Sequence, residues 1–214
     1  MTEAYELPMF PLSAVVFPHA QLALNVFEPR YQQLLSDVQH SSRRFGITLI
    51  SKGSEVGGGD ERVNIGAEVE IEYCTTGEDG RSTLIVRAIE RLQVLQWLDD
   101  APYPRAIVRP MPQRHFTGSP DELTQALVEV RRARALLSEA SEVPALCHAV
   151  DDGWTPDSAS WILCALAPIS LYDAQQLLEV DDPSVRLAHL RRQCRDVAEL
   201  AVGLLEAGDE PTLT

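Results

Sequence analysis

Lysine is almost missing from this chain of 214 residues, since Lys52 is the single lysine among 18 basic side chains. A reaction that needs a buried lysine therefore has one candidate, and it lies beside a glycine-rich stretch. Recognition of an anion would have to use arginine, whose planar guanidinium pairs with carboxylate and phosphate groups. The 32 acidic residues give a net charge of -14, which repels nucleic acid and anionic membrane surfaces at long range. Nucleic acid is therefore not the expected partner.

The sequence also lacks the motifs of several cofactor and metal sites. It has no G-x-x-x-x-G-K-[ST], so no phosphate-cradling ATPase loop is predicted. The glycine-rich stretch 52–61 has no lysine after its glycines and carries carboxylates that would repel phosphate, which favours a loop between strands. The five histidines show neither H-x-x-x-H nor H-x-x-E-H spacing, so no metal site is expected. We predict neither a cofactor nor a catalytic residue.

Four cysteines lie far apart and form no C-x-x-C pair, a pattern that favours reduced, mostly buried thiols over a disulfide scaffold. Cys147 and His148 are neighbours in a segment of helical character. Their side chains would project about 100° apart, so a thiolate–imidazole pair is not expected.

Long apolar runs are missing as well. No stretch of about 18 uncharged apolar residues occurs, and the N-terminus has no basic region followed by a small-residue cleavage site. We expect a soluble chain in the cytoplasm without membrane association.

Residues 1–118 read as strands separated by turns. In GAEVEIEYC, Val69, Ile71 and Tyr73 alternate with Glu68, Glu70 and Glu72, the period of a half-buried strand whose acidic face meets water. Asp79-Gly80 predicts a hairpin turn before the long strand STLIVRAIERLQVLQWL, which has room for a bulge. FGITLIS and YPRAIVRPMP supply two more strands. These patterns indicate a curled, mostly antiparallel sheet or small barrel.

Residues 119–214 read as helices with recognisable caps. SPDEL combines an N-cap serine, a proline at the first helical position and Glu122 as capping-box partner. Similar signals at Thr155-Pro156, Ser170 and Asp182-Pro183 predict three more helices. In the last one, Leu187, Leu190, Cys194, Val197, Ala201 and Leu204 form an apolar seam expected to pack within the bundle. The fold class is therefore α+β, with a β lobe at 1–118 and a helical bundle at 119–214 that holds 7 basic against 17 acidic residues.

The stretch VFEPRYQQLL is predicted to join a strand to a helix within the β lobe. Prolines follow Leu7, Phe10 and Phe17, so the chain before it is predicted to be edge or irregular extended chain, with AVV and LALNVF as short strands. Pro29 suits the first position of a helix, and Glu28 before it is predicted to cap that helix. A catalytic set of Glu28, Arg30 and Tyr31 is the alternative, although no nucleophile lies near it in sequence.

At these residues the chain resembles the N-terminal substrate-binding domain of the ATP-dependent protease Lon. The succession LPMFPL, VVFPH, L-x-L-x-VFE-x-RY, FGI, IGAEVEI, EDGR and PYPRAIV is similar to that domain, and so is LAPISLYDAQQLLEVDDPSVRLAHL in the helical half. The resemblance covers roughly residues 5–205 and implies a PUA-like pseudo-barrel followed by a helical bundle. Lon's ATPase and proteolytic modules have no counterpart here, so we expect the recognition module encoded alone.

The resemblance implies a non-enzymatic module that binds exposed apolar or unfolded polypeptide segments, in some cases to present them to a protease. The candidate binding residues are Phe17, His19, Glu28, Arg30 and Tyr31. Two alternatives stay open. A PUA-like lobe could bind RNA through arginines, or an enzyme could act on a small molecule in a cleft between the lobes. The arginines for the first alternative are those at 81, 87, 91, 105, 109 and 114.

Overall fold

The structure is a computed structural model that describes residues 3–53, 61–141 and 153–208. The chain divides into two compact units, Met1–Gln113 and Arg114–Thr214. The domain limits predicted from the sequence, 1–118 and 119–214, stay a proposal. The Cys147–His148 pair and most of the glycine-rich stretch lie outside the described residues.

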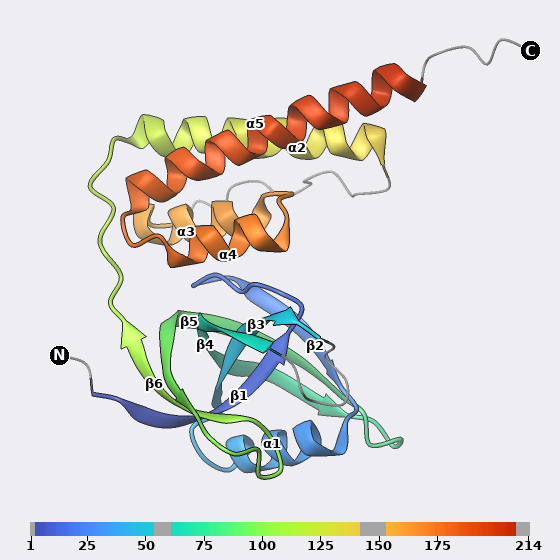
Figure 1. Ribbon diagram of the computed structural model, residues 1–214, viewed down its shortest axis with the longest axis vertical. Helices are drawn as coiled ribbons and strands as arrows, with labels where there is room; N and C mark the ends of the chain where they lie inside the picture. The colour runs from blue at the N-terminus through green and yellow to red at the C-terminus, as the bar shows by residue number, and fades with distance from the viewer. Residues whose placement is uncertain (1–2, 54–60, 142–152, 209–214) are drawn as a thin grey trace, which may run out of the picture. The chain divides into compact units, whose positions relative to one another are not determined.

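The first unit holds one sheet and one helix (Figure 1). Its elements are β1 (Tyr5–Leu12), β2 (Gln21–Val26), α1 (Pro29–Gln39), β3 (Arg44–Lys52), β4 (Glu61–Thr76), β5 (Ser82–Trp97) and β6 (Arg105–Met111). The strand order is β2-β5-β4-β3-β1-β6, and β6 also pairs with β5. That second pairing closes β5, β4, β3, β1 and β6 into a barrel.

The barrel confirms the predicted mostly antiparallel β lobe. β1 and β3 run parallel, whereas the other pairs are antiparallel. The predicted bulge in the long strand is present, because the pairing of β5 with β4 shifts register between Ala88 and Glu90. β2 pairs with the first half of β5, so it stands outside the closed ring of strands.

The prediction for the N-terminal prolines is wrong in two respects. Tyr5–Leu12 forms a strand inside the sheet rather than at its edge, and Ala14–Val16 belongs to no strand. β1 tolerates its prolines because it changes partner along its length: Tyr5–Pro8 pair with β6, and Met9–Leu12 pair with β3. Among the described residues, each half therefore has one edge outside a strand ladder, where a missing N–H costs no ladder hydrogen bond.

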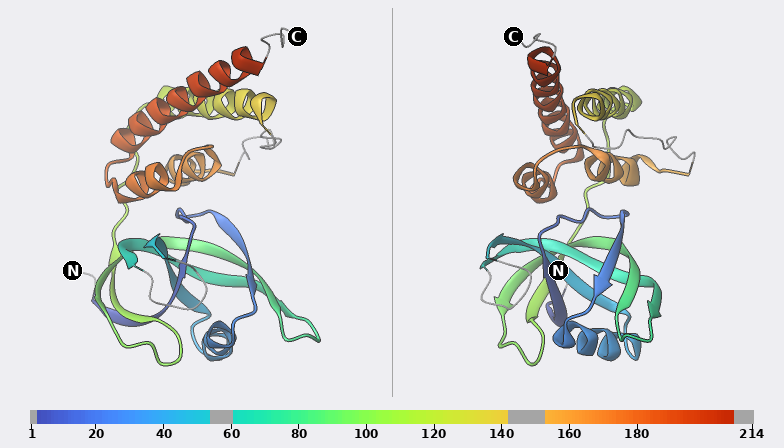
Figure 2. Two further views of the ribbon diagram at one scale, coloured as in Figure 1. Left: turned by 45° about the vertical axis from the view of Figure 1, so that its right-hand side comes forward. Right: turned by 90° about the vertical axis from the view of Figure 1, so that its right-hand side faces the viewer.

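The apolar core of this unit has two clusters. The larger one packs α1 against the sheet and buries one face of the helix, formed by Tyr31, Leu34, Leu35 and Val38. Figures 1 and 2 show α1 lying across one end of the curled sheet. The smaller cluster contains Met9 and Leu92. A Cβ on Gly46 would lie 2.5 Å from Met9 Sδ, so a larger residue at this position would require the Met9 side chain to move.

The acidic face predicted for β4 is only partly exposed. Glu70 and Glu72 are exposed, but Glu68 is buried and accepts a hydrogen bond from the Tyr5 hydroxyl. Arg44 lies 3.6 Å from the same carboxylate. Glu68 stands opposite Glu90 in the β4–β5 register, and burial, followed by the charge of Glu68, raises the pKa of Glu90. Glu68 is covered because the strands close into a barrel. The alternation of apolar and acidic residues along β4 could not predict this closure.

The second unit consists of α2 (Pro120–Ala140), α3 (Pro156–Leu166), α4 (Leu171–Glu179) and α5 (Pro183–Gly208). The predicted caps are confirmed. Ser119 and Glu122 form the capping box, and the hydroxyls of Thr155 and Ser170 each accept a hydrogen bond from a first-turn N–H. These bonds satisfy N–H groups that have no partner within the helix.

The apolar seam of α5 packs against α2, and Figure 1 shows the two helices side by side. Leu187, Leu190, Cys194 and Ala201 are buried as predicted. Leu204 is exposed at 51%, which contradicts the prediction. Ala198 is buried and Val197 only half-buried, so at this point of α5 the buried face is shifted by one residue from the predicted seam.

Candidate functional site

β2 leads directly into α1 at the stretch NVFEPRY, as predicted from the sequence. Val26 ends the strand, and Pro29 begins the helix. Glu28 between them has an extended backbone, with φ -71° and ψ 133°. Its carbonyl oxygen accepts hydrogen bonds from the N–H groups of Tyr31 at 3.0 Å and Gln32 at 2.9 Å. The turn therefore holds the first helical residues at a fixed position beside the end of β2.

Glu28 is the N-cap residue of α1, as predicted, but its side chain accepts no capping hydrogen bond from a first-turn N–H. Its carboxylate instead accepts a hydrogen bond from Arg30 Nε at 3.2 Å. The guanidinium carbon of Arg30 lies 4.5 Å from the ring centroid of Tyr31, a cation–π distance. The structure thus brings Glu28, Arg30 and Tyr31 together, with the two charges neutralising each other on a half-buried surface.

Tyr31 connects this ion pair to the core of the barrel. Its ring is 4% exposed and stacks on Phe10 of β1, with ring centroids 4.0 Å apart and planes inclined by 23°. A small hollow with a volume of about 60 Å³ opens beside the stack. It is lined by Phe10, Pro11, Leu12, Leu24, Asn25, Val26, Phe27, Glu28 and Tyr31. The hollow therefore lies where the second half of β1, the second half of β2 and the start of α1 meet.

Phe17 and His19 occupy the other end of β2. Phe17 is 3% exposed, and His19 is half-buried. His19 has a positive φ of 67°, and its N–H donates to the carbonyl of Ala88 at 2.8 Å. β2 lies between His19 and Glu28 and is itself roughly 17 Å long, at about 3.4 Å per residue. The five predicted residues therefore form two groups, and of the group at the start of α1 Glu28 and Tyr31 line the hollow.

The comparison with protein families gives this geometry its context. The family model of the ATP-dependent protease La (LON) substrate-binding domain matches residues 6–193. The chain belongs to this Lon substrate-binding domain family. The resemblance proposed from the sequence is thereby confirmed, and the match spans both compact units.

Curated relatives in the Lon family share modest identity with the chain. It is 24% identical over 203 residues to the Lon protease of Desulfovibrio desulfuricans, which covers 91% of the chain. It is 23% identical over 185 residues to the Lon protease of Anaeromyxobacter dehalogenans, which covers 85% of the chain. In both comparisons the chain spans 22% of the relative's length.

Solved structures of Lon N-terminal domains have the same fold. A Lon N-terminal domain protein from Xanthomonas campestris superposes with a TM-score of 0.64 at 29% identity, over 87% of this chain and 96% of that one. The N-terminal domain of a Mycobacterium avium complex Lon protease gives a TM-score of 0.58 at 16% identity, over 90% of this chain and 99% of that one. The predicted sheet-then-helices order is thus the fold of Lon N-terminal domains.

Phe27 is the residue of this site that the sequence analysis missed. It follows β2 directly, is 55% exposed and lines the rim of the hollow. The signal was present in the alternation of β2, because Ala23 and Asn25 share the outward parity with Phe27 and are also exposed. Phe27 therefore adds exposed apolar surface at the rim of the hollow.

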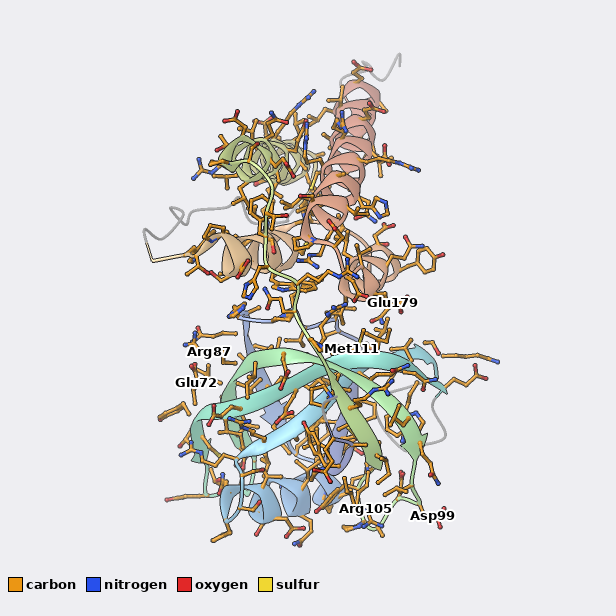
Figure 3. The ribbon with its side chains drawn as sticks, turned by 90° about the vertical axis from the view of Figure 1, so that its left-hand side faces the viewer. Glu72, Arg87, Asp99, Arg105, Met111 and Glu179 are labelled. Atoms are coloured by element: carbon orange, nitrogen blue, oxygen red, sulfur yellow. The ribbon has the colours of Figure 1, made fainter. Side chains whose placement is uncertain are left out.

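The arginines considered for RNA binding do not form a bare cationic row. Arg81, Arg87 and Arg105 pair with Asp79, Glu72 and Glu6, respectively, and Arg91 is buried. Figure 3 shows Glu72 and Arg87 side by side on the surface of the β unit. Side chains whose charge is already neutralised release few counterions on binding phosphate, which weakens the RNA alternative.

A second hollow lies in the helical unit and has a different character. Its volume is about 190 Å³, and its lining is Asp173, Gln176, His189, Arg192, Gln193 and Asp196 from α4 and α5. Gln193 donates to Asp173 Oδ1 at 3.3 Å across it. Every lining residue is polar, so this hollow does not suit an apolar segment.

Within residues 3–53, 61–141 and 153–208, no group of three histidine, cysteine or carboxylate side chains is placed to bind a metal ion. In the same part of the chain, none of the helices is both long enough and apolar enough to cross a bilayer.

Proposed function

We propose that this chain is a non-enzymatic module of the cytosol that binds exposed apolar or unfolded polypeptide segments and presents them to a protease. The observation that carries the proposal is the apolar hollow between β1, β2 and α1 in a chain of the Lon substrate-binding domain family. The exposed Phe27 ring enlarges the apolar surface at its rim.

The chemistry of the hollow supports binding rather than catalysis. Two of the residues that line it are ionisable, Glu28 and Tyr31. The Glu28 carboxylate is paired with Arg30, and the Tyr31 ring is buried in the Phe10 stack. A buried aromatic floor with a neutralised rim attracts apolar side chains by the hydrophobic effect. An unfolded segment loses conformational freedom on binding, so the expected dissociation constant is on the order of micromolar.

Fluorescence anisotropy with a labelled, permanently unfolded apolar polypeptide tests this function, with single-stranded RNA titrated in parallel at low and high salt. The proposal expects saturable, salt-tolerant binding of the polypeptide alone. Binding of RNA alone, with an affinity that falls steeply as salt rises, would favour the alternative. Binding of neither ligand would leave the family assignment standing and remove the proposed function.

Arg30→Ala locates the binding surface. The variant removes the partner of Glu28 and the cation over Tyr31, so it exposes an unpaired carboxylate at the rim of the hollow. We expect several-fold weaker polypeptide binding with a melting temperature close to that of the parent, because the pair joins residues two apart in sequence and holds no separate elements together. Arg81→Ala is the matched control, since it removes the same charge from an ion pair at the β4–β5 hairpin. Equal loss of melting temperature and binding would make Arg30 structural instead.

A further inference from the structure

The β2 strand has an unused edge beside the hollow. β2 pairs with β5 along Gln21–Val26, and within the described ranges 3–53, 61–141 and 153–208 no strand pairs with its other side. Unpaired strand edges carry a row of main-chain donors and acceptors that can accept another strand. The question is which of these groups face the hollow.

The hydrogen bonds at the start of β2 decide the direction of its main-chain groups. Ala88 N–H donates to Ala20 O at 2.9 Å, and the antiparallel ladder repeats every second residue. The bonded pairs therefore continue at Leu22 with Val86 and at Leu24 with Leu84, which stand opposite each other in the register. Asn25 lies between the bonded positions, so its N–H and C=O point away from β5. Asn25 also lines the hollow.

The same reasoning applies to β1 on the other side of the hollow. Met9 N–H donates to Pro104 O at 2.8 Å, away from β3. Pro11 is two residues further along and shares that direction, while the strand pairs with β3 on its opposite edge. Proline has no N–H, so Pro11 offers a carbonyl acceptor alone. The hollow is thus flanked by the donor and acceptor of Asn25 and the acceptor of Pro11.

The size of the hollow selects the side chain that can enter it. Its volume is about 60 Å³. A cavity of about 150 Å³ holds a benzene molecule, so this hollow is too small for an aromatic ring and suits a side chain such as valine. The wall is apolar where Leu24, Val26 and Phe10 contribute to it. The occupant that satisfies both features is an extended peptide with a small aliphatic side chain.

We propose that the module binds its polypeptide by strand addition: the segment pairs with the main chain of Asn25 on the β2 edge and places one small aliphatic side chain between β1 and β2. This inference rests on the proposed function and specifies how the module binds a polypeptide segment. Main-chain pairing gives affinity without demanding one sequence, and the hollow adds a preference at alternate positions.

A series of backbone-methylated peptides tests the pairing with the unmodified protein. The probe is a labelled, capped nonapeptide of alternating threonine and valine, titrated by anisotropy alongside analogues carrying a single N-methyl group at successive central residues. We expect methylation to weaken binding by about tenfold or more at alternate positions and to have little effect at the positions between them. Replacement of the central valine by tryptophan is expected to weaken binding as well.

Two variants of one residue test the protein side. Asn25→Ala keeps the N–H, whereas Asn25→Pro removes it from the edge that β5 does not use, so the β2–β5 ladder is retained. Both variants lose the side-chain contact of Asn25 with Thr83. We expect the proline variant to bind the nonapeptide at least about tenfold more weakly than the alanine variant, whose main-chain N–H at position 25 is intact. Circular dichroism verifies folding, and the methylated peptides decide the question if the proline variant does not fold.

The outcomes separate the two proposals. Equal affinity for all methylated analogues would overturn strand addition while leaving polypeptide binding intact. No binding of either the nonapeptide or the unfolded polypeptide would overturn both proposals. A second copy of the chain is the other possible occupant of the β2 edge, and sedimentation velocity tests for this dimer. Dimerisation that Asn25→Pro abolishes would show that the β2 edge is a self-interface and would also overturn the inference.

Discussion

Phe10 of β1 and Tyr31 of α1 stack with their ring centroids 4.0 Å apart, and this contact joins the hollow to the core of the barrel. Tyr31→Ala should destabilise the protein by about 3–5 kcal/mol, the usual cost of removing a buried aromatic side chain. Urea unfolding followed by circular dichroism measures the change. Tyr172→Ala is the control, because that ring is 71% exposed and its loss should change stability by less than about 0.5 kcal/mol. Similar effects of the two substitutions would contradict the buried stack.

Alkaline pH should weaken the contact between Tyr103 and α1. The Tyr103 hydroxyl donates to Asp37 Oδ2 at 2.7 Å, and burial, followed by this bond, raises the pKa of Tyr103 to about 12. Because the folded pKa lies above the unfolded value of 10.0, the contribution is complete below pH 10 and is lost as pH rises through about 12.

Tyr103→Phe tests that pH dependence. At pH 8 the variant should be less stable than the parent by about 1 kcal/mol, the net value of one hydrogen bond. The stability difference between the two proteins should shrink between pH 10 and 12. Unfolding in urea at several pH values measures it, and the comparison with the parent cancels the titration of other groups. A stability difference between parent and variant that stays constant with pH would contradict the proposed contribution of the Tyr103 hydroxyl.

Two thiols of the helical unit should resist modification. Burial is the main cause that raises the pKa of both Cys164 and Cys194 to about 12, so neither forms a thiolate near neutral pH. Cys74 in β4 is half-buried. Iodoacetamide at pH 8, followed by peptide mass mapping, should label Cys74 well before the other two. Labelling of all three at one rate in the folded protein, as expected in urea, would contradict this burial.

Arg186 should be irreplaceable by lysine. Its side chain is fully buried, its guanidinium carbon lies 3.3 Å from the Trp161 ring centroid, and it donates to Val180 O and Ser160 Oγ. A lysine ammonium cannot stack in this way or reach both acceptors from one plane. We expect Arg186→Lys to destabilise the protein by about 2–3 kcal/mol, measured by urea unfolding. Arg192→Lys, an exposed position on the same helix, should be nearly neutral.

The local signals in the sequence predicted most of the secondary structure. Pro29 marked the start of α1, the capping box at Ser119 marked the start of α2, and the alternation around Val69 marked β4. These features act within a few residues, so they can be read without knowing the tertiary contacts. The order of strands followed by helices was sufficient to indicate the α+β class, and the succession of motifs from LPMFPL to PYPRAIV indicated the resemblance to Lon.

The site could be located only in part. Glu28, Arg30 and Tyr31 were predicted together because they are neighbours in sequence, and Phe10 joins them through a tertiary contact between β1 and α1. The sequence by itself determined most local elements and the caps of α2, α3 and α4, since those depend on propensity and hydrogen bonds over a few residues. The tertiary structure decided that β1 lies inside the sheet, that Glu68 is buried and that the β2 edge faces a hollow. Those features depend on barrel closure, which joins β5 to β6 and brings residues far apart in sequence into contact.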